Sequence, residues 1–328
     1  MIKVNNLKKY FPVVSGIRSV FSGSRGKYVK AVDNVSFEIQ EGEVLGLAGE
    51  SGCGKSTIGR ILVGLDDQTD GDVTFNHMNH QDLKRQSKKK FYQKIQMIFQ
   101  DPYGSINPQH TVEKIISKPL LHQEILDKQQ IRKKTIEILE LVGLTPAVEH
   151  LGKHPHLLSG GQRQRLCIGR AIILEPEFLV ADEPISMLDV SIKSGVLMLL
   201  RDLVKLKNLS LLYITHDLAT VSHICQRIAI MYLGKIVETG PVEQVIKNSQ
   251  HPYTRALVSA IPIPDPDVKR KAVNIKGSIP NAIDIPDGCR FSPRCPWAEP
   301  ICFQTEPQLS VGSDHCCACH RAEEKGEQ

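Results

Sequence analysis

The stretch "GESGCGKST", Gly49 to Thr57, is the most informative glycine-rich loop of this chain. It matches the pattern G-x-x-x-x-G-K-[ST], between an apolar run at 44–49 that predicts a strand and a stretch at 55–65 that predicts a helix. Glycines let the backbone N–H groups of such a loop point at phosphate oxygens, and the helix N-terminus adds a favourable dipole. The stretch therefore predicts a nucleotide-binding loop.

A second stretch, "FLVADEP" at 178–184, completes the predicted site. On its own it could be a strand end with two solvated acids. Beside the phosphate loop, Asp182 is expected to bind Mg²⁺ together with Ser56, and Glu183 to polarise the attacking water, while Lys55 neutralises the phosphates. We expect the nucleotide to contact a set of loop residues: Gly49, Ser51, Gly52, Cys53, Gly54, Lys55, Ser56 and Thr57.

Composition bounds the class of protein. A chain of 328 residues, 41% hydrophobic, exceeds the usual domain size of roughly 100 to 200, so we expect one large α/β domain and a smaller appendage. Its longest apolar runs fall short of the roughly 18 residues that span a bilayer, and the first ten residues do not read as a signal segment, which favours a cytosolic protein. The net charge of +5 and the basic run at 83–90 are assigned to a solvated surface, with no nucleic-acid partner.

Alternating strand and helix patterns support the α/β class. Alternation at 32–39 predicts a half-buried strand, and the apolar runs at 178–182 and 209–215 are typical of strands buried on both faces. Apolar residues at helical spacing predict helices over 131–142 and 188–206.

A third stretch, "LLSGGQRQR" at 157–165, places Ser159, Gly160 and Gly161 just before a predicted helix. Bare N–H groups, a hydroxyl and a helix dipole make a second anion site. A single domain needs one cradle for the γ-phosphate, so the second indicates that two subunits face each other.

With "MIFQDPYGSINP" around Gln100, "ISMLD" at 185–189 and "YITHD" at 213–217, the sequence resembles the nucleotide-binding subunit of an ATP-binding cassette (ABC) transporter. The resemblance covers about residues 1–260. It implies an ABC-type P-loop NTPase with a RecA-like core, an antiparallel β subdomain and a helical subdomain at about 103–172.

The resemblance also implies roles for individual residues. Gln100 would sense Mg²⁺ and the attacking water while its loop contacts the membrane subunits, and His216 would reach the γ-phosphate. Asp189 would lie at the seam of a dimer, and Met187 stands where a small residue is usual. A short segment would close on ATP held by the other subunit: Ser159, Gly160, Gly161 and Gln162.

Adenine in this family stacks on an aromatic residue near the end of the first strand. Tyr10 occupies such a position and is preferred, but an insertion at roughly 12–27 leaves Tyr28 as a competitor.

"HPYTRALVSAIP" at 251–262 and the cysteine-rich end resemble the C-terminal extension of dipeptide and oligopeptide importer ATPases, whose close relatives also handle nickel. The implied partners are two transmembrane permease subunits, a second ABC ATPase that is related rather than identical, and indirectly an extracytoplasmic peptide-binding protein. The implied location is peripheral, on the cytoplasmic face of the cell membrane.

Six of the nine cysteines lie between 289 and 319, and in a reducing compartment spaced cysteines hold metal more often than disulfides. By resemblance, a [4Fe–4S] cluster would be bound by Cys289, Cys295, Cys302 and Cys319. Four thiolates also suit Zn²⁺, although the spacing C-x5-C-x6-C-x16-C is looser than that of zinc knuckles. Unligated thiols in a mobile tail are the remaining alternative, and Cys316 and Cys317 compete for the fourth ligand position.

The predicted domains are a nucleotide-binding domain at 1–260, a proline-rich linker at 261–286 and a metal-binding tail at 287–328. We expect the phosphate loop and the tail to be separate folding units, so that loss of the metal spares ATP binding at Lys55.

Other function classes fit less well. A translation ATPase would carry two cassettes. A chromosome or DNA-repair ATPase would insert long coiled coils or zinc fingers between Lys55 and Asp182, which are only 127 positions apart. A redox enzyme built on the tail would need a substrate pocket or an electron partner that the sequence does not identify.

Overall fold

The computed structural model describes residues 1–13, 27–123, 126–261, 273, 275–277, 280, 282–283, 285–310 and 314–322. Most of the predicted insertion at 12–27 and of the predicted linker at 261–286 lies outside these residues.

One layer is a four-stranded antiparallel sheet in the order β2-β1-β4-β5. Alternation buries Ile2 and Val4, as expected for a sheet with one solvated side, and a register shift after Val4 lets Leu7 join the same core. The strand predicted at 32–39 is confirmed as the second part of β2. The bounds are β1 Ile2–Pro12, β2 Tyr28–Ile39, β4 Asp70–Phe75 and β5 Met78–Asn79.

The central layer is a seven-stranded sheet in the order β11-β10-β9-β3-β8-β7-β6. From β9 to β6 the strands run parallel. At the β9 edge, β10 pairs antiparallel with β9, and β11 pairs antiparallel with β10. Every residue of β3, β7 and β8 is buried, which confirms the three predicted apolar strands. The bounds are β3 Val44–Ala48, β6 Ile95–Ile98, β7 Phe178–Asp182, β8 Ser210–Thr215, β9 Arg227–Tyr232, β10 Lys235–Pro241 and β11 Cys316–Cys317.

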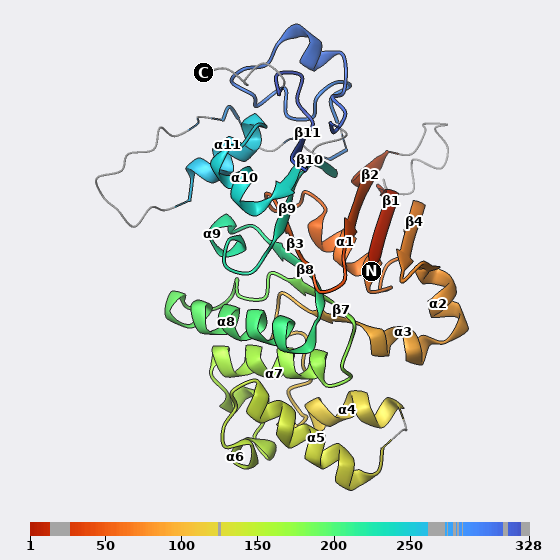
Figure 1. Cartoon of the computed structure of the whole chain (residues 1–328), viewed down its shortest axis with the longest axis vertical. Helices are drawn as coiled ribbons and strands as arrows, with labels where there is room; N and C mark the ends of the chain where they lie inside the picture. The colour runs from red at the N-terminus through yellow and green to blue at the C-terminus, as the bar shows by residue number, and fades with distance from the viewer. Residues whose placement is uncertain are drawn as a thin grey trace.

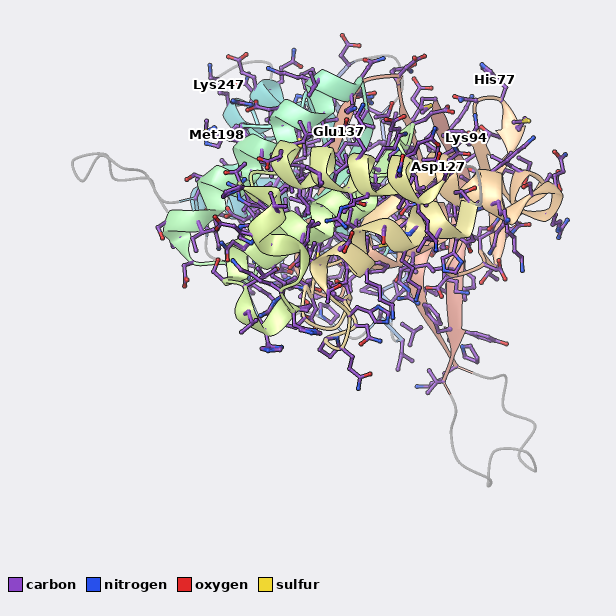
Figure 2. All side chains as sticks on the ribbon, turned by 90° about the horizontal axis from the view of Figure 1, so that it is seen from below. His77, Lys94, Asp127, Glu137, Met198 and Lys247 are labelled. Carbon is purple, nitrogen blue, oxygen red and sulfur yellow. The ribbon has the colours of Figure 1, made fainter. Side chains whose placement is uncertain are left out.

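Helices α4 to α7 form a separate layer, and Figure 1 shows α4, α5 and α6 at the end of the molecule opposite the tail. Figure 2 looks onto this layer, where Asp127 and Glu137 mark α5. A core of buried aliphatic residues from these helices, including Ile116, Leu139 and Leu166, continues under α8 to β7 and β8. The bounds are α4 Val112–Gln123, α5 Lys128–Leu141, α6 Ala147–Leu151, α7 Gly160–Ile172 and α8 Val190–Lys207.

The other described helices are short and connect or cover the sheets. The basic run at 83–90 spans α2 and α3, where its lysines are mostly exposed, as a solvated surface requires. The bounds are α1 Lys55–Leu62, α2 His80–Gln86, α3 Lys88–Lys94, α9 Leu218–Val221, α10 Val242–Lys247 and α11 Pro252–Ser259. None of the described helices is long and apolar enough to cross a membrane.

The cysteine-rich tail has little regular structure, namely η3 Pro300–Phe303 and β11, whose residues Cys316 and Cys317 pair with β10. Figure 1 shows it above β10 and α11. Its side chain Phe291 is 1% exposed and lies in one core with Tyr232 and Tyr253 of the cassette. The tail is therefore packed against the cassette. That the tail and the phosphate loop fold as separate units stays a prediction.

Candidate active site

The phosphate loop joins β3 to α1, and its glycines take conformations that side chains resist. Gly54 has φ 106°, and a Cβ there would lie 2.0 Å from the carbonyl oxygen of Ala31. Gly49 is equally confined, with a Cβ 2.1 Å from the carbonyl oxygen of Met231. The glycines of this motif are therefore needed so that the loop can lie against the neighbouring backbone.

Lys55 begins α1 and is 5% exposed. The ammonium donates hydrogen bonds to the carbonyl oxygens of Gly49, at 2.7 Å, and Glu50, at 2.9 Å. The positive charge therefore lies inside the curve of the loop.

Ser56 and Asp182 lie side by side although 126 residues separate them. The Ser56 hydroxyl donates to Asp182 Oδ1 at 3.0 Å. Burial raises the pKa of Asp182, and the hydrogen bond from Ser56 opposes that rise. A hydroxyl and a carboxylate are hard oxygen donors, which Mg²⁺ prefers.

Glu183 follows β7 directly, and its side chain is 12% exposed. Gln100 Nε2 donates to Glu183 Oε2 at 2.9 Å, and His216 Nδ1 lies 3.0 Å from Oε1. The backbone of Glu183 is left-handed, with φ 46°, and its N–H donates to the carbonyl oxygen of Ile214. The structure thus brings together the predicted catalytic residues from the ends of β6, β7 and β8, the edge where ligands of parallel sheets bind.

The predicted second anion segment makes local contacts. Ser159 is the N-cap of α7 and forms a reciprocal capping box with Gln162. Gly161 faces α8, where a Cβ would lie 2.6 Å from Ile192 Cγ2. Asp189 is the exposed residue before α8. The hydrogen bonds found for the segment satisfy the start of α7 and do not join it to the phosphate loop.

The two candidate adenine residues lie on paired strands and differ in environment. The hydroxyl of Tyr10 donates to Asp33 Oδ1 at 2.5 Å, and burial is the main reason that its pKa is raised. Tyr28 is 50% exposed. Tyr10 is therefore the better anchored of the two.

Four cysteines of the tail converge. Cys289, Cys295, Cys302 and Cys319 line one small cavity of about 20 Å³, together with Trp297 and other residues. Across the part of the chain that the structure describes, no group of three or more His, Cys, Asp or Glu side chains is arranged to hold a single metal ion. The expected metal site is therefore not supported by that arrangement, although the predicted cysteines share a cavity.

Three cysteines lie outside the tail. Cys53 and Cys167 are buried in the core, and Cys225 packs against it. Burial raises the pKa of Cys53 and Cys167, which suits packing residues.

Sequence reasoning missed one contact of the phosphate loop. Glu50 forms a bidentate ion pair with Arg294 of the tail, and its N–H donates to the hydroxyl of Tyr253. A signal was present, because a carboxylate in a loop built for phosphate requires a positive partner.

Two family models match the chain. The model of the ABC transporter family matches residues 32–186, and the model of the oligopeptide/dipeptide transporter C-terminal region matches residues 237–302. The second match includes three of the four cysteines predicted as ligands, namely Cys289, Cys295 and Cys302.

Curated relatives match nearly the whole chain. The dipeptide transport ATP-binding protein DppF of Escherichia coli is 41% identical, over 97% of this chain and 93% of the relative. The oligopeptide transport ATP-binding protein OppF of Salmonella typhimurium is 43% identical, over 97% and 95%. The oligopeptide transport ATP-binding protein AppF of Bacillus subtilis is 42% identical, over 98% and 97%.

Solved structures agree on the fold. A dimeric ATP-binding cassette in a post-hydrolysis state, bound to ADP and Pi, is 27% identical with a TM-score of 0.64, covering 74% of this chain and 99% of that one. A second dimeric structure of a bacterial ABC transporter cassette is 28% identical with a TM-score of 0.62, with the same coverage. From its sequence, its fold and these matches, the chain belongs to the ATP-binding subunits of oligopeptide and dipeptide ABC transporters.

Proposed function

We propose that the chain hydrolyses ATP at the carboxyl edge of its central sheet and thereby powers uptake of di- or oligopeptides through two transmembrane permease subunits. The observation that carries the proposal is the position of the Glu183 carboxylate, between Gln100 and His216 and next in sequence to Asp182. The names of the relatives support the substrate class.

The phosphate loop would bind the phosphates of ATP through its N–H groups and Lys55, with the contacts predicted for Gly49 to Thr57. Ser56 and Asp182, 3.0 Å apart, and Gln100 are the oxygen donors that would hold Mg²⁺. When bound, Mg²⁺ supplies positive charge to the phosphate oxygens. For adenine we favour Tyr10, since its hydroxyl is fixed by Asp33.

Glu183 would orient the water that attacks the γ-phosphorus and accept its proton. Gln100 and His216 contact different oxygens of this carboxylate, so they fix its direction. His216 is 57% exposed, which leaves its ring free to approach a γ-phosphate. The chemistry required of the protein is positioning, as expected for phosphoryl transfer.

A second cassette would complete the site. Ser159 to Gln162 and Asp189 lie at helix starts whose hydrogen bonds are local, so we propose that they act on ATP held by a partner subunit. The dimeric cassettes of similar fold support this arrangement. The partner would be a related ATPase rather than a copy, and the assembly would lie on the cytoplasmic face of the membrane, served indirectly by an extracytoplasmic peptide-binding protein.

In the tail, we propose that Cys289, Cys295, Cys302 and Cys319 hold a [4Fe–4S] cluster, with Zn²⁺ as the alternative. Four thiols around one small cavity are a donor set that fits a cluster. A single zinc ion requires its ligands about 2.3 Å away on all sides. The spacing C-x5-C-x6-C-x16-C, which is looser than that of paired zinc knuckles, is the reason for placing the cluster first.

The test is to co-purify the chain with its membrane subunits and partner ATPase, reconstitute them in vesicles, and measure ATP hydrolysis and uptake of labelled peptides. Peptide-stimulated hydrolysis that is lost in Lys55→Ala would support the proposal. Hydrolysis stimulated by a non-peptide substrate such as nickel, and not by peptides, would overturn the substrate class.

A further inference from the structure

Three neighbouring residues of the tail are fixed inside the cassette. Arg290, Phe291 and Arg294 are 6%, 1% and 7% exposed. The Phe291 ring meets those of Tyr232 and Tyr253, with centroids 5.3 Å and 5.5 Å away. The two arginines therefore start from a well-fixed backbone and reach defined partners.

Arg294 forms an ion pair with Glu50 of the phosphate loop. Its guanidinium donates to both carboxylate oxygens of Glu50, at 2.8 Å and 3.1 Å. Glu50 is also fixed at its N–H by the hydroxyl of Tyr253, at 2.8 Å, and at its carbonyl oxygen by Lys55, at 2.9 Å. Of these contacts, the one from Arg294 joins the loop to the tail.

The ion pair has two consequences for a loop that binds anions. An unpaired carboxylate there would repel the phosphates. Pairing with Arg294 neutralises it, and the bidentate geometry fixes its orientation and that of the adjoining backbone N–H groups. Both effects favour phosphate binding.

The second arginine reaches the other end of the predicted ATP site. Arg290 forms a hydrogen-bonded ion pair with Asp33, and it also donates to the carbonyl oxygen of Leu233. Asp33 in turn accepts the hydroxyl of Tyr10, the residue favoured for stacking on adenine. The tail thus contacts both the phosphate loop, through Glu50, and the Asp33 carboxylate that holds Tyr10.

We propose that Arg294 is a positioning residue of the ATP site: it neutralises and orients Glu50, which makes the cysteine-rich tail a working part of nucleotide binding. The inference rests on the proposed binding of ATP at Gly49 to Thr57. Because linkage is reciprocal, ATP binding also stabilises the docked tail.

The first measurement is the dissociation constant for Mg-ATP of the full chain. Arg294→Met leaves Glu50 unpaired beside the phosphates, so we expect that constant to rise about tenfold. The matched control is Lys235→Met, because Lys235 also joins cassette to tail, through Glu306 at 2.8 Å. We expect it to change ATP affinity less than about twofold.

Two further variants separate positioning from mere attachment. Arg294→Lys keeps one charged donor and should give an intermediate affinity. Arg294→Met combined with Glu50→Gln leaves no unpaired carboxylate, so its dissociation constant should not exceed that of Arg294→Met alone. Effects that multiply in the double variant would contradict the proposal.

ATP should also slow proteolysis of the tail in the wild-type chain and less so in Arg294→Met. ATP affinity of Arg294→Met within twofold of wild type, or an equal loss in Lys235→Met, would overturn the positioning role. If Arg294→Met does not fold, as judged by its thermal melt, the Lys and double variants carry the test. Equal ATP binding by wild type and Lys55→Ala would instead show that the proposed nucleotide site is wrong.

Discussion

The catalytic edge and the cysteine-rich tail are built in opposite ways. At the edge, Asp182 ends β7, Glu183 follows it, and the phosphate loop that leads to Lys55 begins at the end of β3, so the ladders of these strands fix the backbone around the site. The tail has almost no ladder, and buried side chains such as Phe291 and Arg294 fix it to the cassette. In a sequence motif, the local backbone fixes the positions of the functional residues. The position of this tail depends instead on a few side-chain contacts between residues that are far apart in the sequence.

The largest expected effect concerns the edge. Glu183→Gln keeps the hydrogen-bonding shape but removes the charge that polarises water, so hydrolysis in the assembled transporter should fall about 10²-fold or more while ATP binding survives. Lys55→Ala should instead weaken ATP binding itself. Single-turnover hydrolysis and ATP titration distinguish the two, and unchanged turnover in Glu183→Gln would remove this residue from its role.

The next effect concerns the second anion segment. Gly160→Asp places a carboxylate where a partner's γ-phosphate would lie, so like-charge repulsion should reduce dimer closure and hydrolysis about tenfold or more. A Cβ at Gly160 meets Leu188 Cδ2 at 3.6 Å, an ordinary contact, so the fold should survive. ATP affinity of the variant's own loop should barely change, and its loss in a folded chain would contradict the two-subunit arrangement.

A smaller effect distinguishes the two regions directly. Cys295→Ser should abolish the broad absorption near 400 nm and the iron, about four per chain, of anaerobically purified protein, and should loosen the tail to protease. Because Cys295 is next to Arg294, we now expect ATP affinity to fall a few-fold, contrary to the expectation from sequence that it would be spared. Unchanged affinity with a protease-sensitive tail would restore the view of two independent regions, and stoichiometric zinc without iron would change the metal.

The smallest effect is on stability against pH. Burial opposes ionisation of Asp33, but hydrogen bonds from Tyr10 and Arg290 lower its pKa below the ordinary value of about 3.9. A carboxyl group whose pKa is lower in the folded than in the unfolded state stabilises the folded protein above about pH 4. This stabilisation is lost as the pH falls through the pKa of the folded state. Urea unfolding at pH 3 to 6 should therefore show a weaker pH dependence in Asp33→Asn than in the wild type.

The control for this measurement is Asp202→Asn, an exposed position on α8. Its pH dependence should match that of the wild type. If Asp33→Asn also matched, the link between Arg290, Asp33 and Tyr10 would contribute nothing to stability.

Element prediction was accurate where one physical pattern dominated. The helix predicted over 188–206 is α8, Val190–Lys207, and the one predicted over 131–142 is α5, Lys128–Leu141. The earlier start of α5 comes from a capping box between Asp127 and Gln130, a signal that apolar spacing does not contain. The short helices α2 and α3 were missed for the same reason, since caps from Asn79 and Ser87 define them.

From the amino-acid sequence alone one could predict the phosphate loop, the acidic end of the strand and the proximity of the two. Few folds contain both a glycine-rich turn between a strand and a helix and a strand that ends in acidic residues. The sequence also determined which cysteines lie around the tail cavity, through resemblance. The folded structure was needed to reveal that Arg294 pairs with Glu50, 244 residues away, and that Phe291 packs in the core with Tyr253. A side-chain pair of this separation leaves no periodic pattern in the sequence, because its geometry exists only once both backbones are folded.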